Sequence, residues 1–288
     1  MKQSRTVRAG ALFAILALLC SNVSINAAPP ATQGTPQFAA PEFNRLWSRT
    51  DELVRRGEVK RSYFWGPAPF TGPIWEQFEG APDGNKMLVQ YFDKSRMEVF
   101  NPTADKSNPF YVTNGLLADE LIMGRIRLDP TDKYLLKFPA QIPLASDYDD
   151  PTAPTYASFR GLIRTYAKNR IGQVVTESLK PAPDGSFYSH VVATDNRYAA
   201  YGVKYAYHGE GSQNVPDVFW NFLNIRDKVI QNGQTVQARL NDPWFYATGH
   251  PITEPFWASV KIEGKPNTDV LIQAYERRVL TYVPSAPE

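Results

Sequence analysis

The chain has 288 residues, a formal charge of +2 and a single cysteine, which together argue against several classes of protein. Lys2, Arg5 and Arg8 supply three positive charges near the N-terminus, so the rest of the chain carries −1 and lacks the basic excess that a nucleic acid or an anionic membrane requires. Because Cys20 lies in the same N-terminal segment, a processed chain contains no disulfide, thiolate metal site or cysteine nucleophile.

The first 28 residues have the pattern of a secretory signal peptide. A basic start is followed by the apolar run Ala9–Cys20 and then by Ala27 and Ala28, small residues typical of a cleavage site. The run is shorter than the roughly 20 apolar residues of a membrane-spanning helix, so no transmembrane span is expected once the leader is removed. An uncleaved anchor is one alternative. Lipidation of Cys20 is another, although Leu19 precedes it where a lipoprotein signal has a small residue.

Residues 29–42 are rich in Pro, Thr and Gln and are expected to form a disordered tether. A helix is predicted next, because apolar residues recur at i, i+3, i+4, i+10 and i+11 and so share one helix face. These residues are Phe43, Leu46, Trp47, Leu53 and Val54. Gly57 is placed to end this helix.

A motif then occurs twice in the chain, which indicates an internal duplication. Pro69–Trp75 and Pro251–Trp257 both read P-φ-T-x-P-φ-W, where φ is a hydrophobic residue. Each motif is followed by a segment with a shared Q-x-[FY]-[DE]-[KR] signature, whose Gln lies 15 or 16 residues after the Trp of the motif. These segments are Leu88–Met97 and Leu271–Val279, aligned with one deletion at Ser95. The pattern predicts a β-hairpin in each copy.

The predicted helix of the first copy has a counterpart 176 residues later. The matching apolar residues are Phe219, Phe222, Leu223, Val229 and Ile230, with Gly233 at the predicted end. We therefore expect repeat unit 1 at residues 43–124, a divergent middle region at 125–213 and repeat unit 2 at 214–288. The second unit stops soon after Pro284, so either other parts of the chain close it or the product is truncated.

The region between the two motifs is expected to mix short helices with hairpins. Helices are predicted over Leu116–Met123 and Tyr156–Tyr166, a hairpin over Val174–Thr194 and a strand over Tyr201–Tyr207. The predicted fold class is therefore α+β, with short antiparallel β-hairpins packed against amphipathic helices and a duplicated unit flanking the divergent middle region.

Three blocks, Trp65–Ile122, Asn214–Asn224 and Phe245–Ser285, resemble an uncharacterised family of secreted bacterial proteins. The second motif is also distantly similar to the LGFP-type repeats of cell-wall-associated proteins, although the LGFP tetrapeptide itself is absent. The resemblance implies a non-catalytic module at the cell surface that often accompanies wall-acting enzymes. It supplies no catalytic residue and no cofactor.

Carboxylates are the best enzymatic candidates in the sequence, because a glycosidase needs a protonated acid and an ionised partner. The candidates are Glu76, Asp93, Glu98, Glu120, Glu254 and Glu276. Asp93 and Glu276 are equivalent in the two copies and each precedes a cation, which favours a local ion pair of the scaffold. No serine-hydrolase elbow or metal-binding histidine spacing is present. The acidic run Asp147–Asp150 suits calcium or a solvated turn.

The repeated aromatic residues and glutamines are the candidate ligand-binding residues, because aromatic faces stack on sugar rings and amides bind hydroxyls. They are Trp75, Gln90, Trp257, Gln273 and Tyr275. The alternative is that they are core anchors of each unit. We expect a secreted, non-catalytic binding or scaffold protein of the cell envelope or extracellular space, with cell-wall polysaccharide or peptidoglycan as partner and no cofactor or metal. The alternatives are a hydrolase of wall polysaccharide or peptide with paired carboxylates, and a purely structural surface protein. The oligomeric state is left open.

Overall fold

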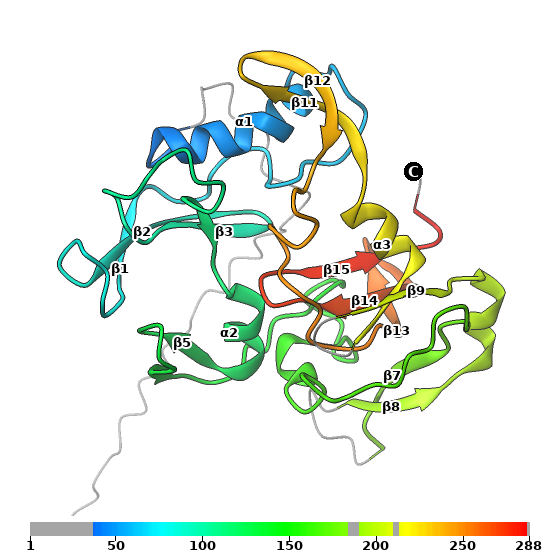
Figure 1. Cartoon of the computed structure of the whole chain (residues 1–288). Coiled ribbons are helices and arrows are strands. Elements are labelled where there is room, and N and C mark those ends of the chain that lie inside the picture. The colour runs from blue at the N-terminus through cyan, green and yellow to red at the C-terminus, as the bar shows by residue number, and fades with distance from the viewer. Residues whose placement is uncertain (1–36, 184–189, 210–212, 287–288) are drawn as a thin grey trace, which may run out of the picture. The chain divides into compact units, whose positions relative to one another are not determined.

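In a computed structural model of the protein, each copy of the repeated motif forms three consecutive antiparallel strands, and the two copies belong to different sheets (Figure 1). We call these strands the first motif hairpin (Ile74–Val99) and the second motif hairpin (Phe256–Tyr282). The structure describes residues 37–183, 190–209 and 213–286, which all belong to one compact unit. Strand accounts for 34% of the structure and helix for only 16%. The predicted α+β class is therefore wrong, because the protein is mostly β and consists of several small antiparallel sheets rather than hairpins packed against helices.

The first sheet follows helix α1 (Pro41–Arg55) and is antiparallel throughout, in the order β1-β2-β3-β4. Its strands are β1 (Ile74–Gln77), β2 (Lys86–Phe92), β3 (Ser95–Val99) and β4 (Thr113–Asn114). The second sheet has the order β15-β14-β13-β7-β8, in which only the β13–β7 pair is parallel. Its strands are β7 (Glu177–Pro181), β8 (His190–Thr194), β13 (Phe256–Ile262), β14 (Lys265–Ala274) and β15 (Val279–Tyr282).

Three two-stranded antiparallel sheets and several short helices connect the two larger sheets along the chain. The small sheets are formed by β5 (Arg125–Arg127) with β6 (Tyr134–Leu136), β9 (Tyr205–His208) with β10 (Asn214–Pro216), and β11 (Arg226–Gln231) with β12 (Gln234–Arg239). The helices are α2 (Leu117–Met123), α3 (Asp217–Leu223) and the 3-10 turns η1 (Tyr156–Phe159) and η2 (Asn196–Tyr201).

The two motif hairpins have the same strand register. Ile74 pairs with Val89 in the first hairpin, and Phe256 pairs with Ile272 at the equivalent position of the second. The threonine that both copies share makes the same contact in each. In the first hairpin, Thr71 Oγ1 accepts from Tyr91 N–H at 3.2 Å. Its counterpart Thr253 accepts from the N–H of Ala274 at 3.0 Å. These matched contacts support our inference that the hairpins arose by duplication.

The predicted second helix is wrong beyond its first two turns. Helix α3 ends at Leu223, and the remaining apolar positions lie on β11 of a hairpin. The turn of this hairpin is Asn232-Gly233, and both residues have positive φ, at 52° and 75°. Asn-Gly with two left-handed residues is the favoured two-residue hairpin turn, so Gly233 closes a β-hairpin rather than a helix. Val229 and Ile230 in addition favour a strand through their branched side chains.

The remaining predicted elements agree with the structure to different degrees. The helices at 43–54 and 116–123 are confirmed as α1 and α2, and the hairpin at 174–194 is confirmed as β7 and β8, although residues 184–189 of its turn lie outside the described residues. The helix predicted at 156–166 is reduced to the single turn η1. Residues 37–42 of the predicted tether are packed, because the Phe38 ring lies 5.4 Å from that of Trp47.

Three groups of buried residues hold these elements together. One joins α1 to the outer face of the first hairpin through Trp47, Phe92 and Met97. The other two cover the opposite faces of the second hairpin, one with Ile122 and Phe159 and the other around Trp257. Both faces of the second hairpin are thus apolar core, whereas only one face of the first hairpin belongs to a core group.

Candidate functional site

The other face of the first hairpin carries charged residues and a tyrosine where the second hairpin carries small or apolar residues. Successive side chains of a strand point to opposite faces, so register identifies the residues that share this face. In the first hairpin they include Glu76, Tyr91, Arg96 and Glu98. The equivalent residues of the second hairpin are Ala258, Ala274, Val279 and Thr281. We call the four residues of the first hairpin, together with Glu120 from α2, the Arg96 cluster.

Arg96 is the centre of this cluster and contacts all of its carboxylates. Its Nε donates to Glu98 Oε1 at 2.8 Å, and its Nη1 donates to Glu120 Oε2 at 2.7 Å. The same Nη1 lies 3.9 Å from Glu76 Oε2. Tyr91 completes the cluster, since its hydroxyl donates to Glu76 Oε1 at 2.7 Å. One guanidinium therefore faces three carboxyl groups.

Burial sets the protonation of the cluster, because the Arg96 side chain is only 5% exposed and that of Glu98 only 12%. Burial opposes the charge of Arg96, but Glu98 and Glu120 outweigh it and raise the pKa of the guanidinium, which stays charged. Burial also raises the pKa of Glu98, and it raises the pKa of Tyr91 to about 12. The raised pKa keeps the Tyr91 hydroxyl protonated, so it donates to Glu76 rather than competing for Arg96.

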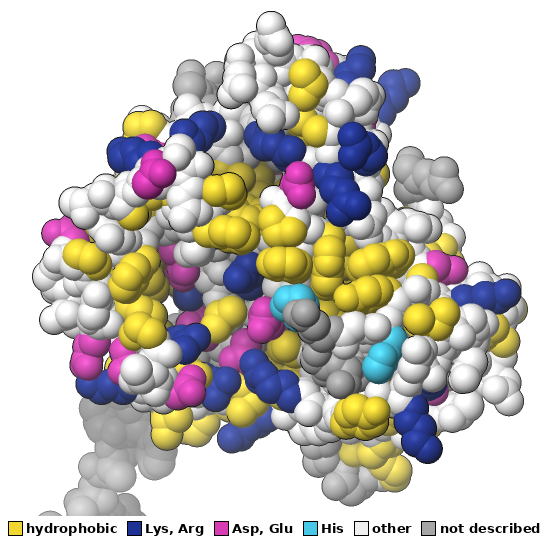
Figure 2. Space-filling model, viewed as in Figure 1, with side chains coloured by type: hydrophobic (Ala, Val, Ile, Leu, Met, Phe, Trp, Pro, Cys, Tyr) yellow, Lys and Arg dark blue, Asp and Glu magenta, His cyan; other side chains and the backbone are white. Residues whose placement is uncertain are grey.

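The cluster forms the floor of a cleft of about 580 Å³, a size typical of small-ligand sites. Glu76, Tyr91, Arg96 and Glu120 line it, and Glu98 is not among the lining residues. The walls are mostly apolar and come from α2, β5, β6 and the segment after β6; they include Leu117, Leu121, Ile126, Leu135 and Phe138. Figure 2 shows acidic and basic side chains close together among hydrophobic ones near α2 and β5.

Gly115 closes the cluster on the side away from the cleft. A Cβ atom at this position would overlap the Nε of Arg96 and the Oε1 of Glu98. The Gly115 N–H also donates to the carbonyl of Arg96 at 2.8 Å. The chain therefore passes directly over the Arg96–Glu98 ion pair, and only glycine leaves room for it.

Most of the ligand-binding residues predicted from sequence lie in the interior. Gln90, Trp257, Gln273 and Tyr275 are all 0% exposed. The ring of Trp257 stacks on Tyr198 at 5.0 Å, and its Nε1 donates to the Val175 carbonyl at 2.9 Å. Protein therefore covers the faces of these side chains. This agrees with the alternative in which they are core anchors of each unit.

Trp75 differs from these residues, because its side chain is 50% exposed although it is equivalent to Trp257. It lies on β1 next to Glu76, so its side chain points to the face opposite to the cleft. The structure therefore does not bring Trp75 to the Arg96 cluster.

The two glutamines bind equivalent backbone groups. Gln90 Nε2 donates to the carbonyls of Thr71 at 2.8 Å and Gln37 at 3.1 Å. Gln273 Nε2 donates to those of Thr253 and Asn214, both at 2.8 Å. Each glutamine thus links its motif to the segment just before the helix of the same copy. This is a structural role.

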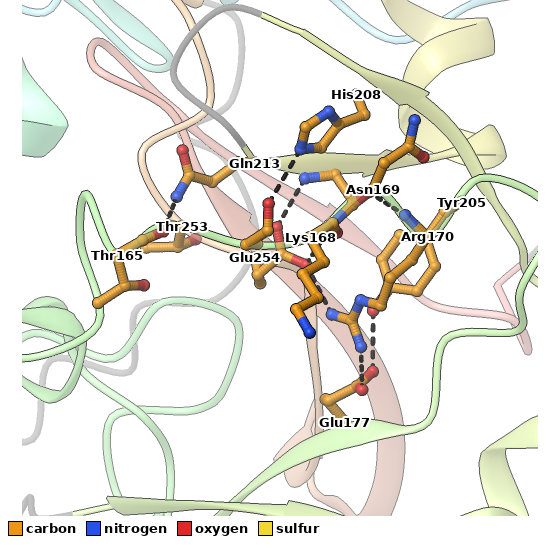
Figure 3. Close-up of polar contacts among 12 residues, drawn as sticks. Thr165, Lys168, Asn169, Arg170, Glu177, Tyr205, His208, Gln213, Thr253 and Glu254 are labelled. Carbon is orange, nitrogen blue, oxygen red and sulfur yellow. Dashed lines mark hydrogen bonds and ion pairs between the residues drawn. The ribbon is translucent and has the colours of Figure 1, made fainter.

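The other predicted carboxylates lie apart from the cleft. Asp93 pairs with exposed Lys94 at 2.6 Å, and Glu276 accepts from the His250 N–H at 3.1 Å. Glu254 belongs to a second polar group shown in Figure 3, where its Oε2 lies 2.6 Å from Arg170 Nη2. Arg170 also pairs with Glu177, whose Oε2 accepts from the Tyr205 hydroxyl at 2.8 Å.

The group in Figure 3 is best explained as a structural junction. Asn214 donates to Glu254 from both its backbone and its side-chain nitrogen, and Arg170 lies over the Tyr205 ring at 4.4 Å. Burial opposes the charge of Glu177, but the Tyr205 hydroxyl and Arg170 outweigh it and lower the pKa of this carboxyl. Arg170, Glu177 and Glu254 are the charged residues held in the interior there, and each has a bound partner. This junction therefore joins four segments of the chain and leaves none of these charges for a ligand.

The acidic run at 147–150 binds the turn between β13 and β14. Asp147 accepts from the N–H groups of Glu263 and Gly264, and Asp150 accepts from that of Lys261. Within the described part of the chain, no group of three or more His, Cys, Asp or Glu residues has an arrangement that could hold a metal ion. Over the same residues, no helix has the length and hydrophobicity needed to cross a membrane.

The chain matches no protein-family model, no curated protein and no solved structure at a significant level. The resemblance to secreted bacterial proteins and to LGFP-type repeats therefore stays a prediction.

Sequence reasoning named three carboxylates of the cluster but missed Tyr91 and Arg96. The deletion placed at Ser95 aligned Arg96 with Arg278, whereas the strand register aligns it with Val279. When the copies are aligned without that deletion, they differ at Tyr91, Arg96 and Glu98. These side chains share one face of the sheet, so the differences indicate that this face has diverged between the copies.

Proposed function

We propose that the protein is an exported, non-catalytic binding protein of the cell envelope or extracellular space, and that its ligand occupies the cleft over the Arg96 cluster. The observation that carries this proposal is the contrast between the two hairpins. The second hairpin has the same register with Ala258, Ala274 and Val279 at the equivalent positions, so the fold of the hairpin does not need the charged residues. A buried cluster of charges costs stability relative to an apolar face, which supports a role outside folding.

The chemistry of the cleft suits a carbohydrate. The carboxylates of Glu76 and Glu120 can accept hydrogen bonds from sugar hydroxyls, while the apolar walls pack against sugar C–H groups. Phe138 lines the cleft and is 94% exposed, so its ring is available for stacking. Cell-wall polysaccharide or the glycan of peptidoglycan is therefore our proposed ligand class.

Hydrolysis by paired carboxylates is the second candidate, because Glu76 and Glu120 both line the cleft and both approach Nη1 of Arg96. A glycosidase needs a carboxyl of raised pKa that faces the scissile bond. Burial raises the pKa of Glu98, but this carboxyl contacts Arg96 and Thr113 and does not line the cleft. The acid is thus not where a ligand could take its proton, and binding is favoured over catalysis.

Retention of the purified protein on insoluble peptidoglycan, chitin and cellulose tests the proposal. We expect saturable retention on at least one polymer, and about tenfold weaker retention for Phe138→Ala and for Glu76→Gln. The matched controls are Tyr166→Ala, an aromatic residue that is 78% exposed outside the cleft, and Glu58→Gln on the surface. Equal retention of cleft and control variants, or no retention on any polymer, contradicts the proposal.

The same samples discriminate the hydrolase. Soluble reducing ends or muropeptides that appear with wild type and Glu58→Gln, but not with Glu76→Gln or Glu120→Gln, would establish hydrolysis in place of simple binding. Thermal unfolding followed by circular dichroism accompanies each variant, so that a loss of retention is not mistaken for a loss of fold.

A further inference from the structure

Arg278 is a buried cation whose binding edge has no partner. The residue is only 7% exposed, and its Nη1 donates to the Phe64 carbonyl at 2.8 Å. Its Nε and Nη2 atoms are buried and make no hydrogen bond with any described residue. These two N–H groups form one edge of the planar guanidinium, the edge that commonly holds both oxygens of a carboxylate or phosphate.

The acids nearest to Arg278 are already engaged. The Asp51 carboxylate accepts from the N–H groups of Phe64, Trp65 and Gly66 at 2.6 to 3.1 Å. Asp93 pairs with Lys94. The charge of Arg278 is instead held over two aromatic rings, with its Cζ 4.9 Å from Phe64 and 4.6 Å from Trp65. Burial without a bound counter-ion lowers the pKa of Arg278 to about 9.

Arg278 lines a cavity of about 500 Å³ that is separate from the cleft over the Arg96 cluster, although Leu117 contributes to both. The cavity is lined by three cations, Lys94, Arg277 and Arg278, and by one acid, Asp93, so its lining has a net charge of +2. Its other lining residues combine hydroxyl groups with an apolar surface. They include Ser62, Ser95, Thr281, Tyr156, Phe222 and Leu280.

The cavity lies where the two repeated signatures meet. Asp93 and Lys94 follow Gln90 of the first copy, and Arg277 and Arg278 follow the equivalent Gln273 of the second copy. Lys94 N–H donates to the Trp65 carbonyl and Arg277 N–H donates to the Thr248 carbonyl, an equivalent contact in each copy. The two copies therefore supply the walls of one positively charged cavity.

We propose that this cavity is an anion-binding site for a partly apolar ligand with a carboxylate or phosphate group. The ligand displaces the groups that cover the Nε and Nη2 edge of Arg278, and this edge then holds the two oxygens of the anion. Burial of a guanidinium costs desolvation energy, and without a bound counter-ion no electrostatic attraction offsets this cost. An oxyanion bound through two oxygens supplies that attraction. The apolar lining is then the contact surface for the rest of the ligand. This site is independent of the proposed glycan cleft.

Four soluble probes test the site: acetate, benzoate, inorganic phosphate and phenyl phosphate, each titrated at constant ionic strength against sodium chloride. We expect a saturable rise in the unfolding temperature of the wild-type protein, larger for the probe with a ring in the preferred pair, and the same affinity by calorimetry. The carboxylate and phosphate pairs distinguish the two sources of the oxyanion. Because the readout uses small anions and no polymer, its failure is distinct from failure of the proposed glycan binding.

Arg278→Met removes the fork and should weaken binding of the preferred probe at least about tenfold, which corresponds to loss of one good charge-assisted contact. Arg160→Met, at an exposed arginine, is the matched control and should bind as wild type. Arg278→Met should also be at least as stable as wild type without a probe, because it removes an uncompensated buried charge. Equal binding by wild type and Arg278→Met, or no saturable response to any probe, overturns the proposal.

A second measurement on the wild type keeps the test independent of whether the variant folds. The Arg278 Nε–H resonance of arginine-labelled protein should shift saturably during titration with the preferred probe, with the same midpoint as the unfolding-temperature curve. An unchanged Arg278 resonance at saturating concentrations of all four probes would equally overturn the site.

Discussion

The two motif hairpins share a register and a set of backbone contacts but bury their faces differently. The second hairpin is apolar on both faces, and each face packs into a group of buried residues. The first hairpin has one apolar face against α1 and one charged face that forms the floor of a cleft. The backbone contacts of Thr71 and Thr253 therefore belong to the shared scaffold, whereas the charged face is present in the first copy and not in the second.

This comparison also separates the repeated residues by role. Residues that recur in both copies, such as Gln90 and Gln273, lie in the interior and bind backbone groups. Residues that differ between the copies, such as Tyr91 and Arg96, line the cleft. At these positions, identity between the copies marks residues that the fold needs, and difference marks residues that line the cleft. Trp75 is an exception, because it is identical in both copies but 50% exposed in the first.

The largest expected effect concerns the equivalent tryptophans. Trp257→Ala should lower the free energy of unfolding by about 4 kcal/mol, because it empties a fully buried site next to Tyr198 and Tyr201 and removes a hydrogen bond. Trp75→Ala should cost less than about 1 kcal/mol, since half of that side chain is exposed. Urea unfolding of both variants measures the difference, and equal losses would show that the copies bury this position alike.

Arg96→Met should lower the free energy of unfolding by about 3 kcal/mol, because Glu98 and Glu120 would keep buried carboxyl groups without their cation. The control is Arg55→Met, whose ion pair with Glu52 involves a side chain that is 46% exposed and should be worth less than about 1 kcal/mol. Urea unfolding is again the measurement. A small loss for Arg96→Met would show that solvent reaches the Arg96 cluster far more than its burial indicates.

The shared scaffold is tested by the paired threonines. Thr253→Val should cost about 2 kcal/mol, because the N–H of Ala274 loses its hydroxyl acceptor in a fully buried place. Thr71→Val should cost about 1 kcal/mol, since the same bond to Tyr91 lies in a partly buried site. Thermal unfolding of the two variants gives the ratio. A loss in only one variant would contradict our inference that the two contacts are equivalent.

The sequence predicted the parts of the fold in which local pattern and tertiary packing agree. Helix α1 has a continuous apolar face and Gly57 beyond its end, and both motif hairpins follow from their alternation and shared signature. The second helix was mispredicted because 219–230 has the same apolar spacing, although Asn232-Gly233 is a strong hairpin signal. Apolar spacing alone does not distinguish this segment from a helix, whereas the Asn-Gly turn identifies it as a hairpin.

The candidate site was predictable only in part, for a physical reason. Glu120 reaches Arg96 from α2, 24 residues along the chain, and the apolar walls of the cleft come from segments with no repeated pattern. The burial of Trp257 also depends on η2, which brings Tyr198 and Tyr201 over its ring. Single-sequence patterns describe neighbours along a helix or strand and hold little information on such distant partners.

The smallest expected effect is a pH dependence that separates Glu98 from Thr281, the neutral residue at its equivalent position. Burial raises the pKa of Glu98 above its ordinary value of 4.5, so the folded state holds this proton more tightly than the unfolded chain. The resulting stability is fully present below about pH 4.5 and is lost as the pH rises through the raised pKa. Glu98→Gln stays neutral and cannot lose it.

The free energy of unfolding of wild type, relative to Glu98→Gln, should therefore be higher near about pH 4 than near about pH 7.5. Glu76, Arg96 and Glu120 face the same group and are unchanged in both proteins, and Glu58→Gln controls for removal of one surface charge. Urea unfolding at both pH values gives the result. A difference that grows with pH would mean that Arg96 holds Glu98 ionised.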